Sequence, residues 1–304
     1  MKYILTTQDL TKRYGKHSAA EKINIHIKKG EIYGLIGRNG AGKTTILRMI
    51  SGLSNPTEGT YSINGKSGAQ INGEKRQVGT LIEAPGLYPN MSAYENLKIK
   101  CIATGKNNRE YIEELLTLVG LENTGNKKTK EFSLGMRQRL GIALALAGDP
   151  ELIILDEPIN GLDPQGIVEI REILAKLSKE KGITIVISSH ILDELSKIAD
   201  SYGIIHEGKL LEELTSKQLN QKCGEFVILK TDDADKAAQV LRGMNIADYE
   251  TADDKTIKIN ESDTDTAEIV RQLVSADVGV NEIYCNRLTL EEYYLNLTGG
   301  NNNA

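Results

Sequence analysis

The sequence contains few cysteines, and their arrangement restricts what the protein can be. Cys101, Cys223 and Cys285 are the three cysteines among 304 residues, and they lie far apart. They form no C-x-x-C pair and have no histidine cluster near them. This pattern does not match a zinc site, and it is consistent with a reducing cytosol.

The chain also lacks a long hydrophobic run. Its longest apolar stretches are far shorter than the roughly 18 residues that a membrane-spanning helix needs; they lie at 140–147, 152–155 and 183–187. The N-terminal segment MKYILTTQDLTKRYGK has no apolar region of the signal-peptide type. We therefore expect a chain that neither crosses a membrane nor is secreted, so that any membrane role depends on a partner.

Charge is distributed unevenly along the chain. Residues 1–222 contain 30 Lys and Arg against 26 Asp and Glu, whereas residues 223–304 contain 7 against 16. Such an acidic C-terminal part is a poor ligand for phosphate backbones, and we expect no nucleic-acid partner. The length and the 39% hydrophobic content suffice for one large core and one small one, which predicts two domains.

The clearest motif is a glycine-rich loop between a strand and a helix. The apolar segment EIYGLIG leads into GRNGAGKTT at 37–45, which matches G-x-x-x-x-G-K-[ST], and apolar residues at helical spacing follow. In such a loop backbone N–H groups surround phosphates, Lys43 reaches the β- and γ-phosphates, and Thr44 places its hydroxyl on Mg²⁺. A fortuitous glycine-rich turn is the alternative, and the flanking strand and helix disfavour it. The predicted ATP contacts in this loop are Gly37, Asn39, Gly40, Gly42, Lys43, Thr44 and Thr45.

Two further apolar segments predict buried parallel strands. ELIILDEP and ITIVISSH are separated by a helical pattern over about 164–181, which predicts a βαβ crossover. Before them, 85–148 has a helical character, with an S-x-x-E capping box at Ser92 and Glu95, and predicts a helical insertion. After residue 215 the pattern changes to short strands alternating with two amphipathic helices, which predicts a compact α+β domain over 223–304.

An acidic pair ends the strand LIILDEP. Two adjacent carboxylates beside an apolar core are costly unless a cation or a water needs them. We expect Asp156 to hold Mg²⁺ and Glu157 to orient or deprotonate the attacking water. The alternative, a strand that ends in a solvated acidic turn, is disfavoured by the phosphate-binding loop upstream.

With these motifs in order, residues 1 to about 215 resemble the nucleotide-binding subunit of the ABC superfamily. FSLGMRQRL, at 132–140, corresponds to the signature element of that family. The resemblance implies that Ser133 and Gly135 bind the γ-phosphate of an ATP held by a second subunit, in a head-to-tail dimer with two ATP molecules at the interface. Ser133 could instead be only a helix cap.

Three more residues take their roles from the resemblance. His190 matches the switch histidine that contacts the γ-phosphate and positions the nucleophilic water. Asp163 matches the aspartate loop between subunits, although Asp163 and Pro164 also form an ordinary N-cap and first helical residue. Tyr14 matches the aromatic residue that stacks on adenine, and packing on the sheet is its alternative.

The sequence departs from the family at two places. Glu83 stands where glutamine is usual, with Mg²⁺ as its expected ligand, and the signature has Leu134 and Met136 instead of glycine and glutamine. Together with the C-terminal domain, these features resemble the branch of bacterial exporters for peptide antibiotics, of the lantibiotic-immunity and bacitracin-resistance types. The segment 83–96 is the implied contact with a permease.

These observations predict an α/β fold: a P-loop NTPase of the ABC type, with a RecA-like parallel sheet, an antiparallel β arm, the helical insertion at about 85–148, and a small C-terminal α+β domain. The expected domains are 1–215 and 223–304. The expected activity is Mg²⁺-dependent ATP hydrolysis that powers transport by a separate membrane permease, at the cytoplasmic face of a bacterial membrane, together with a second ATP-binding subunit. The alternative is a soluble ABC ATPase such as an iron–sulfur assembly factor.

Overall fold

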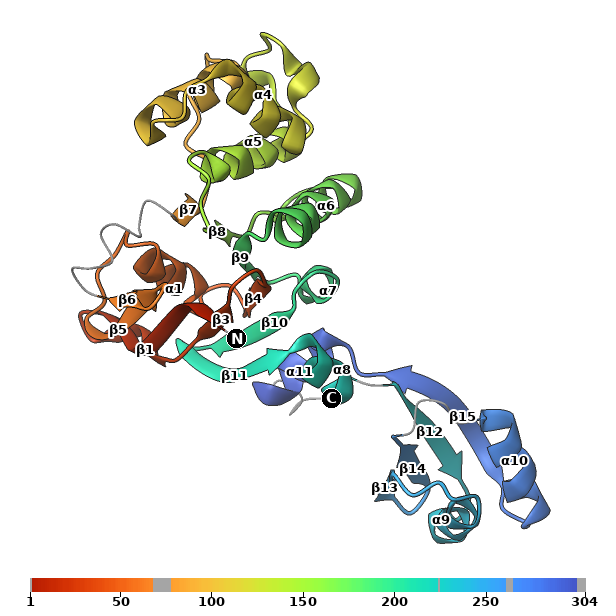
Figure 1. Ribbon diagram of the computed structural model, residues 1–304. Helices are drawn as coiled ribbons and strands as arrows, with labels where there is room; N and C mark the ends of the chain where they lie inside the picture. Colours follow the sequence, from red (N-terminus) through yellow and green to blue (C-terminus); the bar gives the residue numbers. More distant parts are fainter. Residues whose placement is uncertain (1, 68–77, 224, 261–264, 300–304) are drawn as a thin grey trace. The chain divides into compact units, whose positions relative to one another are not determined.

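The computed structural model describes residues 2–67, 78–223, 225–260 and 265–299 (Figure 1). The chain divides into two compact units, Met1–Ser216 and Lys217–Ala304. The accessory domain expected at 223–304 includes residues 224, 261–264 and 300–304, which lie outside the described part.

A central sheet organises the first unit. Its strands follow the order β11-β10-β4-β9-β8-β7; β10, β4, β9, β8 and β7 run parallel, and β11 pairs antiparallel with β10. The segments are β4 Ile32–Ile36, β7 Val78–Leu81, β8 Leu152–Asp156, β9 Thr184–Ser189, β10 Ser201–His206 and β11 Lys209–Thr215. Every residue of β4, β8 and β9 is buried, as expected for parallel strands covered on both faces.

An antiparallel arm lies beside this sheet and contributes to the same core (Figure 1). It consists of β1 Tyr3–Tyr14, β2 His17–Ile23, β3 His26–Lys28, β5 Glu58–Ile63 and β6 Lys66–Ser67. Residues 23–27, INIHI, alternate between apolar and polar side chains, but they do not form one strand, because β2 ends at Ile23 and β3 begins at His26. Asn24 causes the break: its side-chain amide donates to Lys22 O and Asp9 Oδ1 and accepts from Asp9 N, which holds a turn.

The helical insertion contains three helices, α3 Ala93–Thr104, α4 Arg109–Leu118 and α5 Leu134–Leu146, with short 3₁₀ turns η3 Glu122–Thr124 and η4 Thr129–Glu131 between α4 and α5. The predicted capping box at Ser92 and Glu95 is present. Helix α5 approaches β7 closely, since a Cβ at Gly79 would lie 1.9 Å from Ala145 O. Glycine at this position therefore allows the insertion to pack directly on the sheet.

The remaining helices of the first unit join consecutive strands. Helix α1 Lys43–Ile50 follows β4, helix α6 Pro164–Lys181 connects β8 to β9, and the short α7 Leu192–Ser196 precedes β10. The bounds of α6 are those that the sequence pattern indicates, because Asp163 caps its first turn and Gly182 ends it in the left-handed conformation.

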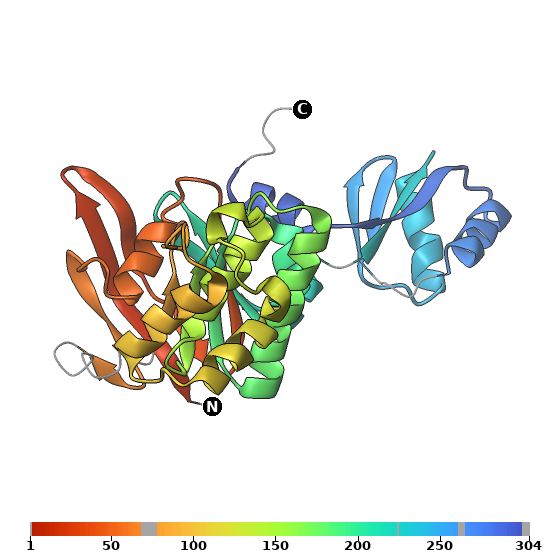
Figure 2. The same cartoon turned by 90° about the horizontal axis from the view of Figure 1, so that it is seen from above.

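The second unit is a two-layer α+β fold, as predicted (Figure 2). Its antiparallel sheet has the order β13-β14-β12-β15, with β12 Glu225–Thr231, β13 Tyr249–Asp253, β14 Thr256–Ile259 and β15 Val280–Arg287. Helices α9 Ala234–Gly243 and α10 Thr266–Ser275 share one core with the sheet, and α8 Ser216–Lys222 and α11 Leu290–Leu297 lie at the two ends of this segment of the chain. None of the helices formed by described residues has both the length and the apolar character that crossing a membrane requires.

Candidate functional site

The glycine-rich loop joins the carboxyl end of β4 to the first residue of α1. Gly42 precedes α1 with φ 106°, and a Cβ there would lie 2.3 Å from Ala19 O. At Gly37 a Cβ would lie 2.5 Å from Ile205 O. Both positions therefore require glycine, the first for its backbone conformation as well as for space. No side chain of Gly42 can cap α1, so the first backbone N–H groups of the helix can donate to an anion such as phosphate.

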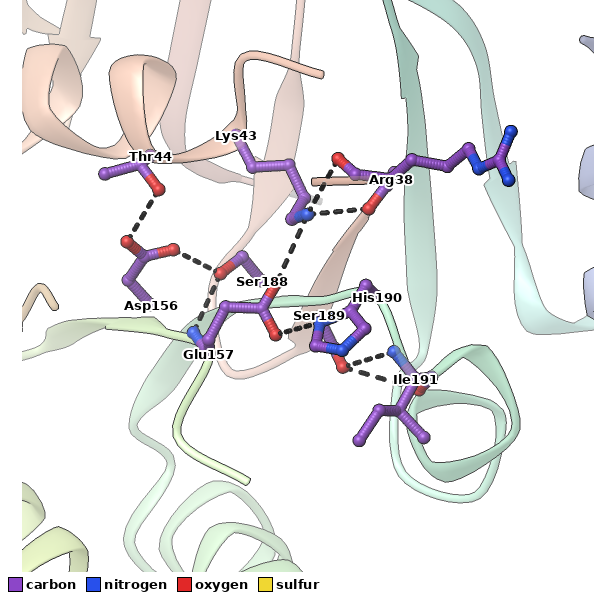
Figure 3. A network of polar contacts seen from close by, with 10 residues as sticks. Arg38, Lys43, Thr44, Asp156, Glu157, Ser188, Ser189, His190 and Ile191 are labelled. Atoms are coloured by element: carbon purple, nitrogen blue, oxygen red, sulfur yellow. Dashed lines mark hydrogen bonds and ion pairs between the residues drawn. The ribbon is translucent and has the colours of Figure 1, made fainter. Parts of the chain in front are cut away.

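Lys43 is part of this loop, and its side chain turns back onto the loop backbone. Its Nζ donates to the backbone oxygens of Gly37, at 2.6 Å, and of Arg38, at 3.3 Å. The same atom lies 3.2 Å from Oε1 of Glu157, and the lysine side chain is 5% exposed (Figure 3). The loop thus directs the ammonium group toward the acidic end of β8.

Asp156 and Thr44 meet at this edge of the sheet. Thr44 Oγ1 donates to Asp156 Oδ2 at 2.8 Å, although the two residues are 112 positions apart (Figure 3). Asp156 is 4% exposed, and its other oxygen accepts from Ser188 Oγ at 2.6 Å. A hydroxyl and a carboxylate side by side are the hard oxygen donors that Mg²⁺ prefers. No cluster of three or more His, Cys, Asp and Glu residues suited to a metal exists among the described residues, so phosphate and water oxygens would complete such a site.

Glu157 is held between a lysine and a histidine. Its backbone has φ 49°, an uncommon value for a residue with a side chain, and its N–H donates to Ser188 Oγ at 2.9 Å. Oε2 lies 2.8 Å from His190 Nδ1 (Figure 3). Oε1 is buried, and its contact with Lys43 is an ion pair without hydrogen-bond geometry. This oxygen therefore retains the capacity to accept a hydrogen bond from a water molecule.

Ser188 is a residue of this site that the sequence reasoning missed. It is fully buried in β9, and its hydroxyl links the side chain of Asp156 to the backbone of Glu157. A serine inside an otherwise apolar buried strand was the available signal, because such a hydroxyl needs a hydrogen-bond partner. A turn closed by Ser189 Oγ and the backbone N–H of Ile191, at 2.9 Å, then sets the direction of the chain around His190.

The structure pairs Glu83 with Arg48 rather than with the residues of this cluster. Glu83 follows β7 with φ 65°, and its carboxylate forms an ion pair with Arg48 of α1. The two side chains are 63% and 40% exposed. Arg48 stands four residues after Thr44 on the same helix, so both side chains point to the same side of α1. The magnesium role expected for Glu83 stays a prediction.

Ser133 and Asp163 both act as helix caps in the structure. Ser133 Oγ accepts from Met136 N at 3.2 Å, and Asp163 Oδ1 accepts from Gly166 N at 3.0 Å. Ser133 is exposed, and Gly135 lies in the first turn of α5. Leu134 lies close to Gly161, since a Cβ added at Gly161 would be 3.3 Å from Leu134 Cδ2. Capping does not exclude the roles between subunits, which stay predictions, because an exposed capped N-terminus can also face an anion.

Tyr14 lies at the turn between β1 and β2 and is 52% exposed. Strand β2 contains Ala19, the residue next to Gly42. The hairpin of β1 and β2, whose turn follows Tyr14, therefore lies next to the phosphate-binding loop. An exposed aromatic ring at this place is available for stacking, and Lys12 Nζ lies 5.3 Å from its centroid.

A phosphate-binding loop and an acidic strand end, brought together at one edge of a parallel sheet, identify the class of protein as a P-loop nucleoside triphosphatase. The ABC transporter family matches residues 20–160. The chain is 43% identical over 302 residues to the bacitracin transport ATP-binding protein BcrA of Enterococcus faecalis, a match that covers 99% of this chain and 98% of that protein. This chain therefore belongs to the ABC transporter family, as an ATP-binding subunit with ATPase activity.

Two further comparisons agree with this assignment. The lantibiotic transport ATP-binding protein SrtF of Streptococcus pyogenes is 47% identical over 210 residues, which are 69% of this chain and 90% of that protein. The dimeric ATP-binding cassette MJ0796, solved in a post-hydrolysis state with ADP and Pi, superposes with a TM-score of 0.62 at 27% identity, over 70% of this chain and 98% of that one. The predicted fold and the predicted bacitracin and lantibiotic branch are confirmed, and the iron–sulfur alternative is not supported.

Proposed function

We propose that this chain powers the export of a peptide antibiotic, of the bacitracin type, by a separate membrane permease at the cytoplasmic face of the cell membrane. The observation that carries this proposal is the match to BcrA along nearly the whole of both chains, C-terminal unit included. A match limited to the ATPase unit would support the motor alone, because that unit is common to many transporters.

The hydrolytic chemistry follows from the contacts of Glu157. Its buried Oε1 would accept a hydrogen bond from the attacking water, while His190 Nδ1 holds Oε2 and fixes the orientation of the carboxylate. Lys43 would contact the β- and γ-phosphates from inside the loop, and its positive charge would stabilise the charge that develops on the transferred phosphoryl group. The Ser188 hydroxyl contacts both the Asp156 side chain and the Glu157 backbone, and so holds the two residues in position relative to each other.

The residues present fit a magnesium ion. Thr44 and Asp156 would hold it, directly or through its water shell, because their oxygens already lie 2.8 Å apart at the end of the phosphate-binding loop. When bound, Mg²⁺ would neutralise charge on the β- and γ-phosphates. Glu83 is a further candidate ligand if its carboxylate leaves Arg48.

Two copies of the chain, or this chain and a close paralogue, would complete the site. The exposed N-terminus of α5, with Ser133 and Gly135, would face the γ-phosphate bound to the partner, and Asp163 would lie at the interface between them. Tyr14 would stack on adenine. ATP binding would then close the pair and hydrolysis would open it, which is a two-state change that a permease can use.

The permease contact would lie next to Glu83. A groove of about 180 Å³ opens between β7 and α5, and it is lined by Leu53, Thr80, Leu81, Ile82, Ala84, Pro85, Gly86, Gly141 and Leu144. Leu53 is 65% exposed, and Tyr88 nearby in sequence is 54% exposed. A groove that offers both apolar side chains and polar groups, with exposed large side chains at its edge, suits a short amphipathic helix of a partner. We assign residues 1–215 to this catalytic and docking role and 223–304 to an accessory domain.

Purification from the native membrane tests the transporter. If the chain is tagged and the membrane is solubilised gently, we expect a multi-helix membrane protein to co-purify in stoichiometric amount, identified by mass spectrometry. Leu53→Asp should reduce this recovery, whereas Val274→Asp, a change of the same kind on the exposed surface of α10, should not. Recovery of soluble partners alone would contradict the proposal.

The substrate is tested in cells. A strain that lacks the chain should lose tolerance to bacitracin, and the wild-type chain should restore it while Glu157→Gln does not. If tolerance is unchanged while the permease still co-purifies, the chain is a transporter subunit but bacitracin is not its substrate.

Glu83→Gln tests whether Glu83 serves Mg²⁺ or only Arg48. If it is a metal ligand, removing its charge should raise the half-saturating Mg²⁺ concentration of the ATPase by about 3–10-fold. Arg48→Met should then not raise that concentration, because it releases the carboxylate. If both variants leave the Mg²⁺ dependence unchanged, the carboxylate does not serve the metal. Because the ion pair is exposed, neither variant should change the stability by more than about 1 kcal/mol.

A further inference from the structure

Among the described residues of the second unit, helices cover one face of the sheet and leave the other face open. Residues of the covered face, such as Val227, Leu229, Ile257 and Ile259, form the core with α9 and α10. Because side chains alternate along a strand, their neighbours in sequence point to the opposite face. The pairing register places these neighbours in two rows across the sheet: Glu250, Lys258, Ile228 and Tyr284, and next to it Thr256, Lys230 and Glu282.

The middle of this open face is apolar, and its surroundings carry both signs of charge. Ile228 is paired with Tyr284, which is 44% exposed. Phe226 lies beside them, with Lys258 Nζ 4.6 Å from its ring centroid. On the other side of Ile228, Lys230 forms an ion pair with Glu282 at 2.8 Å. An apolar centre with a charged rim is typical of the core and rim of a protein interface.

The charge of the open face differs from that of the domain around it. Residues 223–304 contain 7 Lys and Arg and 16 Asp and Glu. The open face carries Lys230 and Lys258 against Glu250 and Glu282, with Asp253 at the hairpin turn on its border. Two strongly acidic domains repel each other, and a nearly balanced face is the surface through which they can still meet. A two-fold contact brings the same patch of both copies together, so charges can pair across it when each patch carries both signs, as this face does.

We propose that the open face of the sheet, centred on Phe226, Ile228 and Tyr284, docks against the same face of a second copy of this chain. The proposal rests on the paired ATPase proposed above. Four strands about 4.8 Å apart and about five residues long present roughly 350 Å². This is well below the roughly 800 Å² per partner of a stable interface, so the contact cannot hold two chains together by itself. It adds to a pairing that ATP has already brought about, because the second contact is then intramolecular.

The comparisons show that the ATPase unit can occur without this domain. The match to SrtF ends after 210 residues and covers 90% of that protein, so SrtF has too little remaining sequence for a comparable C-terminal unit. A relative of the ATPase unit therefore occurs without a comparable domain. A contact that prolongs the paired state, without contributing a catalytic group, is consistent with such an addition.

Subunit exchange of the full-length chain tests the proposal. Chains with Glu157→Gln are labelled with donor or acceptor fluorophores, paired separately in ATP and Mg²⁺, then mixed, and the exchange rate is read from energy transfer. Tyr284→Glu and Ile228→Asp should each accelerate exchange by about tenfold, because they place an acid at the centre of both docking faces. Val274→Asp is the matched control on α10, where the side chain is 61% exposed, and it should exchange at the parental rate. Circular dichroism and thermal unfolding check that the variants fold.

The outcomes separate this inference from the proposed function. If the Glu157→Gln chain forms no pair in ATP, the paired ATPase fails and the docking of the open face fails with it. If pairs form and the variants at Tyr284 and Ile228 exchange like the Val274 control, this inference alone is wrong. Loss of the permease from Tyr284→Glu preparations, with unchanged exchange, would mean that the permease occupies the face, and would also overturn docking of a second copy.

Discussion

Replacing Glu157 with glutamine should abolish ATP turnover while leaving ATP bound between two copies of the chain. The amide keeps the size of the carboxylate and can still contact Lys43, but it cannot accept a proton from water. A general base contributes about 10²–10⁴-fold to a rate, and we expect the steady-state ATPase rate to fall by that factor. Because Asp156, Thr44 and Lys43 are unchanged, ATP affinity should be retained, and size-exclusion chromatography in ATP should show a dimer.

Glu172→Gln is the matched control for this result. Glu172 is an exposed residue on α6, and the same substitution there should leave both turnover and pairing unchanged. Turnover by the Glu157→Gln chain at the parental rate would reject Glu157 as the base. If the Glu157→Gln chain turns over ATP slowly but forms no dimer in ATP, Glu157 remains the general base, and the proposal that two copies share the ATP site is wrong.

Replacing Gly42 with alanine should eliminate ATP binding through geometry alone. The residue has φ 106°, which side chains disfavour, and the added methyl would lie 2.3 Å from Ala19 O, far inside van der Waals contact. Since Ala19 belongs to β2 of the arm, either the loop or the arm must move, and the N–H groups at the start of α1 move with the loop. We expect ATP affinity to fall by at least about 100-fold, measured by isothermal titration, and stability to fall by about 1–3 kcal/mol.

Gly105→Ala is the control that separates the effect of backbone strain from the loss of the ATP-binding site. Gly105 ends α3 with φ 78°, and a methyl group there would meet no atom within 4 Å. This variant should lose about 1 kcal/mol of stability and bind ATP normally. If Gly42→Ala binds ATP as well as Gly105→Ala does, the close approach of Ala19 is not what makes glycine necessary in the loop.

Much of the fold could be predicted because its signals are local. The loop at 37–45 is identified by its glycines and lysine, Ser92 with Glu95 marks the start of α3, and Asp163 with Pro164 marks the start of α6. Each of these signals depends on backbone groups within a few residues, so nothing distant is needed to recognise it. The apolar alternation at 23–27 is a local signal that does not hold in the structure. Asn24 forms hydrogen bonds with Asp9, a residue of β1, and the strand is interrupted there.

The candidate site could be predicted residue by residue but not as an arrangement. The sequence separates Thr44 from Asp156 by 112 positions and Glu157 from His190 by 33. Only the parallel order of β4, β9 and β8 brings these residues to one edge of the sheet. Ser188 joins this group solely because β9 pairs with β8. The ion pair between Glu83 and Arg48 is a contact that the sequence did not indicate, and the role of Glu83 as a metal ligand stays a prediction.

The sequence by itself determined the phosphate-binding loop, the acidic strand end, the helix caps and the change to an acidic α+β segment near residue 215, because these depend on residue type and short spacing. Tertiary structure alone decided which hydroxyl holds Asp156, which cation meets Glu83, and which face of the C-terminal sheet is left open. Those outcomes depend on strand order and register, and these are set by the packing of segments far apart in the chain, where no local pattern records the partner.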